Sequence, residues 1–558
     1  MTDKKPYMKG SKALSVMVAM MFAASAVAII FSAAAASNND QDNMFTDGFL
    51  GEGGDIRERI NFGGNGNDVF YDVIIVPDGF VAVGYSDKES FGDDIWEDVD
   101  GYGKKDAIIV KYGPDWELNW FVNFGGAGDD VFYGVAMIPN PDQGYLLFAV
   151  GYSDFESFGT GSWKDMYQDQ PDPVGYGDKD AIIVAFTDEG DVFDAMNFGG
   201  AGDDVFYGVA VHEGDIFAVG YSDFESFGNG SWKDMYQDRP DPVGYGGRDA
   251  IIVGFLESKT GPPTVAALNF GGAGDDEFYG VAVSGEGMVF AVGYSDEDSF
   301  GNGDWIQMGT KRGGLDAIIV LFENGAKTFA MNFGGAGDDV FYDVAVSSNG
   351  DVFAVGYSAA SSFGTGSWNN NWLPDQTKPA AHGNLDAIIV GFRDYEVLGA
   401  MNVGGAGDDV FYGVEVSSEG DVFAVGYSAP PFGSGFLADY TQKGGKDAIA
   451  AGFRDGELFG FMTFGGAGDD EFYSVVITEN PNEGYTLYAV GYSAASSFGT
   501  GDWTGVQGKG NKDAIVMMID GGEIPTTGGD DNLILYIAIA VAVSAIVIAA
   551  AYFFVFKK

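Results

Sequence analysis

The phrase GG-x-G-(D/N)-D-x-FY occurs seven times along this chain, beginning at Gly63, Gly125, Gly199, Gly271, Gly334, Gly404 and Gly465. Successive copies stand about 60 to 75 residues apart. Self-similarity at such a period indicates one supersecondary unit copied in an array. The repeat therefore restricts the fold to a repeat architecture before any other feature is considered.

Each unit reads as four short apolar strands. Examples are Phe132 to Met137 for the first strand, Phe217 to Ser222 for the second, Asp249 to Val253 for the third and Ala330 to Phe333 for the fourth. These runs are nearly continuous in hydrophobic residues, as in sheets that are buried on both faces. Gly and Ala inside the strands would let neighbouring sheets approach closely. Four-stranded sheets packed face to face around an axis form a β-propeller.

The two ends of the array predict a closed ring. The last unit ends after its third strand, Asp513 to Asp520, and a polar linker, GGEIPTTGGDDN, follows. An orphan fourth strand, Ile56 to Phe62, precedes the first unit. If the orphan strand completes the last sheet, every sheet has four strands and no blade is left incomplete. The expected fold is an all-β, seven-bladed propeller over residues 56–520, closed by its N-terminal strand.

The repeat resembles the bacterial and archaeal β-propeller repeat family whose units read GGxGDD, then GYT or GYS, then DAFV. The stretches FGGAGDDVFYGVAV, DVFAVGYSAASSFGTG and GNKDAIVM carry this resemblance, which covers roughly residues 56 to 520. Departures are Asn67 for the first Asp, Val403 for Phe, and the loss of Ser before Phe432. The resemblance implies a scaffold in a cell-surface protein more than it implies an activity.

Composition excludes several kinds of chemistry. The 558 residues include no cysteine, which rules out disulfides and thiolate ligands or nucleophiles. The formal net charge of −55 disfavours binding to nucleic acid and to anionic lipid. The same charge attracts divalent cations or cationic partners.

The N-terminus predicts a targeting segment. Residues 1–12 contain four lysines, and an apolar stretch with small residues at its end runs from Ala13 to Ala36. Residues 1–36 are therefore expected to be a signal peptide or an uncut signal anchor. An acidic linker, residues 37–55, separates this segment from the propeller.

The C-terminus predicts a transmembrane helix. Residues 533–556 carry no charge over 24 positions, a length of about 36 Å as a helix. Lys557 and Lys558 follow this segment, and Asp530 and Asp531 precede it, which places the tail in the cytoplasm and the propeller outside. The linker, residues 521–532, is short and leaves the propeller on the face opposite the GGAGDD turns and long loops. The face with these turns and loops is therefore expected to point away from the cell.

Long loops between the second and third strands hold most of the tryptophans. Because exposed aromatic rings suit sugar faces and protein hot spots, these rings are candidate ligand-binding residues. The main interpretation, however, is that the recurring SFGxGxW motif is an anchor that packs each loop onto its own sheet, because a residue that recurs in six of the units more often serves the repeat. The candidates are Trp96, Trp163, Trp232, Trp305, Trp368, Trp372 and Trp503.

The acidic GGAGDD turn has two interpretations. It resembles a calcium-binding nonapeptide, but copies more than 60 residues apart cannot stack as a β-roll, so a structural turn is the main interpretation and one calcium per turn the alternative. The aspartate that opens each third strand, such as Asp180, is also interpreted as structural. The calcium candidates are Asp129, Asp130, Asp203, Asp204, Asp275, Asp276, Asp338, Asp339, Asp408, Asp409, Asp469 and Asp470.

The sequence favours adhesion or recognition at a prokaryotic cell surface, with surface glycans or proteins as partners. A structural coat component with cation-dependent lateral contacts is the alternative. Catalysis is not expected and no catalytic residue is predicted, because the two histidines, His212 and His382, occupy non-equivalent positions away from any nucleophile motif. Some glycosidases need only carboxylates and a tyrosine, so a glycan-active enzyme stays a third hypothesis.

Overall fold

The computed structural model describes residues 56–92, 94–140, 144–164, 166, 171–233, 235–236, 240–256, 264–306, 308–369, 378–433, 435–438, 440–480 and 484–520. The chain divides into two units, of which one spans Phe49–Asn480 and Tyr485–Gly521 and forms the sheets below. The other unit contains Met1–Gly48, Pro481–Gly484 and Gly522–Lys558, and only Gly484 of it is described.

Several sequence predictions lie outside the described residues. These are the signal peptide or anchor, the two linkers, the transmembrane helix with its basic tail, and Trp372. Among the residues that are described, no helix is long and apolar enough to cross a membrane.

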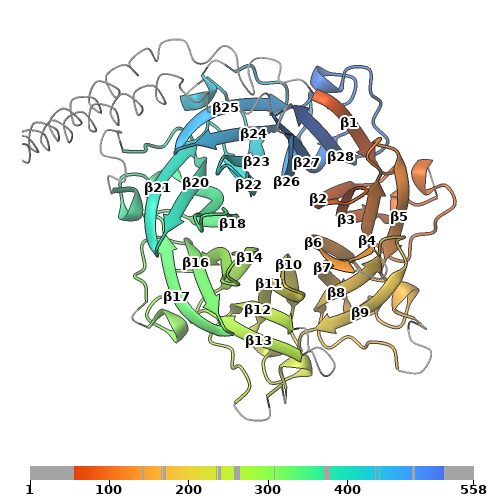
Figure 1. Cartoon of the computed structure of the whole chain (residues 1–558), viewed down its shortest axis with the longest axis horizontal. Helices are drawn as coiled ribbons and strands as arrows, with labels where there is room; N and C mark the ends of the chain where they lie inside the picture. Colours follow the sequence, from red (N-terminus) through yellow and green to blue (C-terminus); the bar gives the residue numbers. More distant parts are fainter. Residues whose placement is uncertain are drawn as a thin grey trace, which may run out of the picture. The chain divides into compact units, whose positions relative to one another are not determined.

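Seven four-stranded antiparallel sheets surround a common axis and form the blades of a propeller (Figure 1). Blade 1 is β2 (Asp68–Val76), β3 (Gly79–Asp87), β4 (Lys105–Tyr112) and β5 (Leu118–Phe124). Blade 2 is β6 (Asp130–Asn140), β7 (Gly144–Asp154), β8 (Lys179–Thr187) and β9 (Val192–Phe198). Blade 3 is β10 (Asp204–His212), β11 (Asp215–Asp223), β12 (Arg248–Leu256) and β13 (Thr264–Phe270).

The remaining blades repeat this order. Blade 4 is β14 (Asp276–Val283), β15 (Val289–Ser295), β16 (Asp316–Glu323) and β17 (Ala326–Phe333). Blade 5 is β18 (Asp339–Val346), β19 (Val352–Ala359), β20 (Leu385–Arg393) and β21 (Glu396–Val403). Blade 6 is β22 (Asp409–Val416), β23 (Val422–Ser428), β24 (Asp447–Arg454) and β25 (Glu457–Phe464). Blade 7 is β26 (Asp470–Asn480), β27 (Gly484–Ala494), β28 (Lys512–Asp520) and β1 (Ile56–Phe62).

The first strand of the chain closes the ring. β1 pairs antiparallel with β28, with Phe62 opposite Ala514 and Ile60 opposite Val516, so it is the outer strand of blade 7. The predicted closed, seven-bladed, all-β propeller is therefore confirmed. Because every sheet is completed to four strands, the ring itself has no unfinished blade that could pair with another chain.

The apolar core lies between neighbouring blades. One cluster of buried side chains combines Val83 and Ile109 of blade 1 with Phe132 and Leu147 of blade 2. Equivalent clusters join blades 2 and 3, 3 and 4, 4 and 5, 5 and 6, and 7 and 1. The nearly continuous hydrophobic strands of each repeat are explained by this arrangement, because each sheet is covered by a neighbour on both faces.

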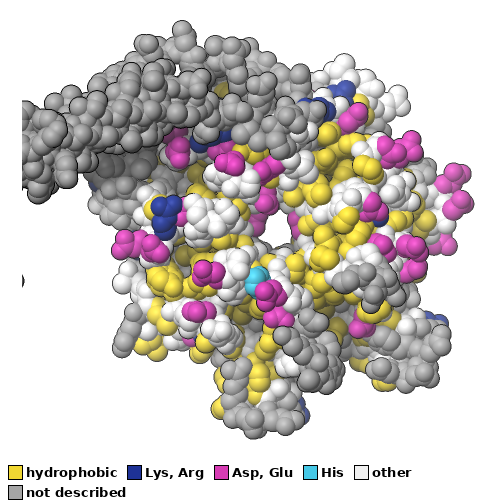
Figure 2. All heavy atoms as spheres, viewed as in Figure 1, with side chains coloured by type: hydrophobic (Ala, Val, Ile, Leu, Met, Phe, Trp, Pro, Cys, Tyr) yellow, Lys and Arg dark blue, Asp and Glu magenta, His cyan; other side chains and the backbone are white. Residues whose placement is uncertain are grey.

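Tyrosines line the axis. The innermost strand of each blade carries one tyrosine, and neighbouring rings lie with centroids 4.9 to 5.2 Å apart, so that the seven form a closed circle. Each also lies 5.8 to 6.1 Å from a second-strand tyrosine of its own blade. The inner rings are Tyr71, Tyr133, Tyr207, Tyr279, Tyr342, Tyr412 and Tyr473. Figure 2 shows an opening at the centre of the ring.

A glycine in each second strand allows close packing at the inner strand pair. A Cβ on Gly220 would lie 1.8 Å from the carbonyl oxygen of Val205. This contact lies beside a β-bulge between Phe206 and Gly208 on the partner strand.

We expect Gly220→Ala to lower the free energy of unfolding by more than about 3 kcal/mol, because the methyl group would force two backbones apart. Gly254→Ala is the matched control: its Cβ would lie 3.3 Å from a flexible Leu256 methyl, and blade 2 carries Ala185 at this position. The control should cost less than about 1 kcal/mol in urea unfolding. Equal losses in the two variants would contradict the close-packing account.

Candidate functional site

The connections that enter each first strand and the loops between second and third strands lie together on one face, here called the loop face. A hydrogen-bonded aspartate joins them. Asp130 Oδ2 accepts from Gly126 N–H at 2.8 Å and from the Ser157 hydroxyl at 2.7 Å, and Ser157 Oγ accepts from Gly128 N–H at 3.0 Å. The same bonds recur at Asp68, Asp204, Asp276, Asp339 and Asp470.

Blade 6 lacks this serine, as the sequence showed before Phe432. There Asp409 accepts from Gly405 N–H at 2.8 Å and from the hydroxyl of Ser428, at the end of the second strand. The buried aspartate is therefore kept even where its loop partner has changed.

Burial shifts the protonation of these aspartates. Desolvation raises the pKa of Asp130, Asp204 and Asp276 to about 7 each, although their hydrogen bonds lower it in part. The same burial raises the pKa of Asp68 and Asp339 to about 6. Because the pKa of these buried carboxyl groups lies near neutral pH, their charge state changes with pH in the neutral range.

In the turns that enter blades 4, 5 and 7, the first aspartate caps the preceding blade. Asp275 Oδ1 accepts from Arg248 N–H at 2.9 Å, and Asp338 and Asp469 make the equivalent bonds at 3.0 Å. Within the described residues, no group of three or more His, Cys, Asp or Glu side chains could hold a metal ion. Among the calcium candidates, Asp130, Asp275 and Asp338 accept hydrogen bonds from N–H or O–H groups, as the aspartates of a structural turn do. Oδ1 of Asp129, Asp130, Asp204 and Asp276 is buried and has no hydrogen-bond partner among the described residues. Calcium binding stays a prediction.

The aspartate that opens each third strand also has a structural role. Asp180 accepts from the N–H groups of Tyr176 and Gly177 at 2.9 and 3.1 Å, and from Asn197 Nδ2 at 2.6 Å. Asn197 also donates to the carbonyl of Val174 at 2.9 Å. The equivalent asparagine therefore fastens the end of the long loop in six blades, whereas blade 6 has Thr463 at this position.

The six described loop tryptophans are fully buried. Trp163 donates from Nε1 to Ser153 Oγ at 3.1 Å and packs edge-on against Phe124, the last residue of the preceding blade, with centroids 4.9 Å apart. Trp96, Trp232, Trp305, Trp368 and Trp503 make the same edge-on contact at 4.9 to 5.3 Å. These rings anchor adjacent blades to each other, and in this structure they offer no surface to a ligand.

Blade 6 shows how the anchor is replaced. Leu437 stands where the other blades have tryptophan, and Val403 stands where the preceding blade has phenylalanine. Both are fully buried in one cluster. Val403 and Leu437 thus together replace the phenylalanine and tryptophan that pack against each other between the other blades.

The loop face nevertheless exposes apolar side chains. Of the fourteen large hydrophobic side chains that are exposed in the described residues, nine lie in second-to-third-strand loops of blades 1 to 4. They are Tyr102, Phe155, Val174, Tyr176, Phe224, Val243, Tyr245, Ile306 and Met308. Such a concentration on one face makes the loop face a candidate interaction surface.

Three of the exposed tyrosines reach across to the next blade. A Cβ on Gly161 of blade 2 would lie 2.9 Å from Cγ of Tyr102 of blade 1, so the ring rests on this glycine. Tyr176 and Tyr245 rest in the same way on Gly230 and Gly303. Together with Phe155 and Phe224, these rings form an aromatic row that runs along blades 1 to 3 and is 41% to 56% exposed.

The aromatic row is confined to part of the ring. At the position of Tyr102, blades 4 to 7 carry Arg312, His382, Lys443 and Lys509. At the position of Phe155, only blade 3 has another phenylalanine. The repeat does not require aromatic residues at either position, whereas six of the seven blades keep the buried tryptophan and blade 6 replaces it with Leu437.

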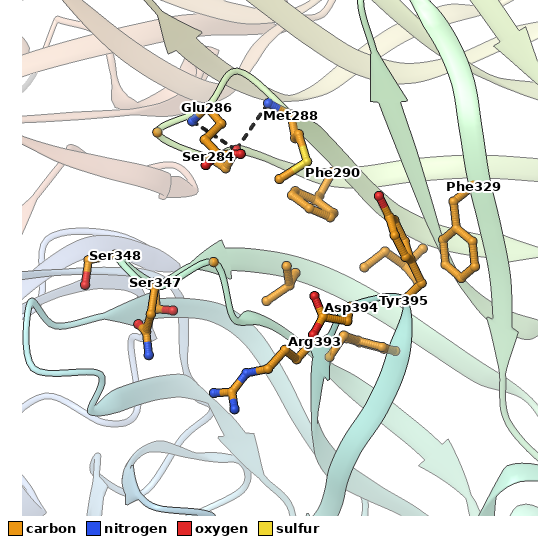
Figure 3. Close-up of a pocket in the computed structure, with 16 residues that line it drawn as sticks. Ser284, Glu286, Met288, Phe290, Phe329, Ser347, Ser348, Arg393, Asp394 and Tyr395 are labelled. Atoms are coloured by element: carbon orange, nitrogen blue, oxygen red, sulfur yellow. Dashed lines mark hydrogen bonds between the residues drawn. The ribbon is translucent and has the colours of Figure 1, made fainter. Parts of the chain in front are cut away.

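The opposite face contains a groove between blades 4 and 5 (Figure 3). This cavity of about 420 Å³ lies beside the Ser284–Met288 and Ser347–Gly350 turns. The rings of Phe329 and Tyr395 pack at one end with centroids 5.1 Å apart, and Arg393 pairs with Asp351. None of its lining residues is a histidine that could activate the serines, and the sequence predicted no site here.

No protein-family model and no curated protein sequence matches the chain. Among solved structures, the chain is similar to an acylaminoacyl peptidase from Pyrococcus horikoshii, with a TM-score of 0.31 and 11% identity over 78% of this chain and 51% of that chain. It therefore spans about half the length of that peptidase. It is also similar to an ulvan lyase of a new polysaccharide lyase family, solved with a bound saccharide, with a TM-score of 0.38 and 10% identity over 84% of this chain and 96% of that one.

Proposed function

We propose that this protein is a recognition or adhesion propeller that binds its partner through the aromatic row on the loop face. The observation that carries this proposal is the exposure of Tyr102, Phe155, Tyr176, Phe224 and Tyr245 on consecutive blades of a rigid ring. Flat rings held on a rigid frame suit stacking against sugar faces, and they lose little conformational entropy on binding. A cell-surface glycan or glycoprotein is therefore the partner that best fits.

The proposal includes an extracellular location. Residues 1–36 act as a signal peptide or signal anchor, and residues 533–556 cross the membrane once with the C-terminus in the cytoplasm. The propeller then stands outside the cell with the loop face directed away from the membrane. The net charge of −55 suits a soluble exterior domain that does not bind nucleic acid.

Binding by the full chain to whole cells of the same strain, and to an array of neutral and acidic polysaccharides, tests the proposal. The combined variant Phe155→Ala, Tyr176→Ala, Phe224→Ala and Tyr245→Ala should lose more than about tenfold in affinity, because interface aromatics contribute most of the binding energy. Its thermal unfolding should stay within a few degrees of wild type, because the rings are half exposed.

A matched control removes four exposed apolar side chains from the start of the outer strands β9 and β21 and from the turn before β21, toward the opposite face: Val192→Ala, Phe193→Ala, Tyr395→Ala and Leu398→Ala. This control should bind as wild type does. If wild type bound nothing in the panel, or if the loop-face variant bound unchanged, the recognition proposal would fail.

The second candidate is a coat component whose acidic surface forms cation-dependent lateral contacts. The observation that favours it is the net charge of −55. Ordered arrays of full chain that form in calcium, and form equally well with the loop-face variant, would support it. A glycan-active enzyme is the third candidate, and release of reducing ends from the same polysaccharides would support that role.

A further inference from the structure

One position near the mouth of the axial channel carries a cation in five consecutive blades. It is the residue just before the aspartate that opens each third strand. Going around the ring through blades 6, 7, 1, 2 and 3, the residues are Lys446, Lys512, Lys105, Lys179 and Arg248. Blades 4 and 5 carry Leu315 and Leu385 instead, so the fold itself does not require a charge here.

Each of these cations is half-buried over the second-strand tyrosine of its own blade. Nζ lies 3.7 Å from the ring centroid of Tyr492 for Lys512, 4.3 Å from Tyr85 for Lys105, and 4.6 Å from Tyr152 for Lys179. These tyrosines pack on the circle of inner tyrosines. In five of the seven blades a charge therefore lies over a tyrosine that packs on the inner circle.

Two of the five cations have a buried carboxylate partner from the next blade. Arg248 pairs with Glu277 at 2.6 Å, and Lys446 pairs with Glu471 at 2.8 Å. Both glutamates follow the two aspartates of the turn and are almost fully buried. At this position the other blades have valine, so a glutamate replaces valine in each blade that follows one of these two cations.

The other three cations, Lys512, Lys105 and Lys179, lack this partner, and we call them the axial lysines. The next blade presents a valine in each case: Val69, Val131 and Val205. Among the described residues, no ion pair joins an axial lysine to a carboxylate.

Lys512 lacks two neighbouring carboxylates. The next blade has Val69 in place of glutamate, and the backbone neighbour of Lys512 is Asn67, where every other turn has aspartate. Burial lowers the pKa of Lys512, and repulsion from Lys446 and Lys105 adds to this effect. The charges of Glu471 and Asp469 act in the opposite direction without cancelling it. Cations on neighbouring blades are therefore close enough to repel one another, which an anion between them would relieve.

We propose that the axial lysines form a binding site for an oxyanion, the carboxylate or sulfate group of a ligand at the mouth of the channel. Three half-buried ammonium groups on consecutive blades provide charge-assisted donors that the protein leaves unpaired. The anion is either a free inorganic ion or an acidic group of a sugar chain. The site is separate from the aromatic row, although Lys105 and Lys179 stand only three residues after Tyr102 and Tyr176.

Calorimetric titration of the full chain with sodium sulfate and with a galacturonate trimer tests this inference, with ionic strength held constant by sodium chloride. The variant Lys105→Met, Lys179→Met and Lys512→Met keeps the length of each side chain and removes the charge, and Leu315 and Leu385 show that the fold accepts an apolar residue. Its affinity for the anion should fall by more than about tenfold.

The matched control is Lys88→Met, Lys164→Met and Lys233→Met, which removes three exposed lysines from loops of the same face. It should bind the anion within about twofold of wild type, because solvent and salt screen exposed charges and they contribute little to affinity. Saturable binding of sulfate identifies a free-ion site, whereas binding of the trimer alone identifies an acidic sugar. Equal loss in both variants, or no binding of either probe to wild type, would overturn the inference, and neither result bears on the alanine variants of the aromatic row.

Discussion

Replacing Trp163 with alanine is expected to lower the free energy of unfolding by about 3 to 5 kcal/mol. The side chain is fully buried, packs on Phe124 of the preceding blade and on Phe158 of its own loop, and donates to Ser153. The alanine would leave a cavity between two blades and an unpaired serine hydroxyl. Urea unfolding, followed by the midpoint and slope, measures the change.

Blade 6 supplies the control for this prediction. Trp163→Leu alone and Phe124→Val alone should each destabilise the protein, whereas the double variant reproduces the natural Leu437 and Val403 pair. The double variant should therefore lose less than the sum of the two single losses, by about 0.5 to 3 kcal/mol. Strictly additive losses would contradict the view that the two residues act as one inter-blade contact.

The protein is also expected to be more stable in weak acid than at alkaline pH. Burial raises the pKa of Asp130, Asp204, Asp276 and Asp409 from 3.8 to about 7. Between these values the folded state holds protons that the unfolded state has released, so the free energy of unfolding falls as pH rises. Each unit of pKa difference corresponds to about 1.4 kcal/mol, so the four groups should favour about pH 5 over pH 8 by about 5 kcal/mol or more.

Unfolding in urea at a series of pH values measures this dependence. Asp130→Asn removes one titrating group from the buried set and keeps the shape of the side chain, so the variant should show a shallower fall between about pH 5 and pH 8. An Asp→Asn change at an exposed position such as Asp191 is the control, and it should leave the slope unchanged. Stability that rises across this range would show that the buried aspartates are ionised without cost.

The fold could be predicted from the sequence because its signals are redundant. Seven copies of one phrase determine the number of blades, and the orphan strand Ile56–Phe62 can be accounted for only by pairing with the last unit. The strand phrases end where the strands end, since the same GGAGDD turn follows each fourth strand. The residues that recur in every unit are those that build the blade, so the repeated pattern predicts the fold.

The candidate site could not be predicted in the same way. The tryptophans recur in six of the units, which favours a packing role over ligand binding, and Trp163 and its equivalents are buried between blades. Phe155, Tyr176 and the axial lysines occur in only some units, so they stand out only after the units are aligned and their burial is known. Whether a lysine has a partner depends on the next blade, for example on Val131 or Glu277, and this relation is visible only in the folded ring.

The most direct test of the central claim is to block one face at a time. The chain has no cysteine, so Tyr176→Cys on the loop face and Phe193→Cys on the opposite face each introduce a single thiol at an exposed position. Each full-length variant is coupled to a bulky maleimide and its binding to whole cells and to the polysaccharide array is compared before and after coupling. The account predicts that the label at position 176 abolishes binding and that the label at position 193 has no effect. Retained binding with the loop face blocked, or loss only with the opposite face blocked, would contradict it.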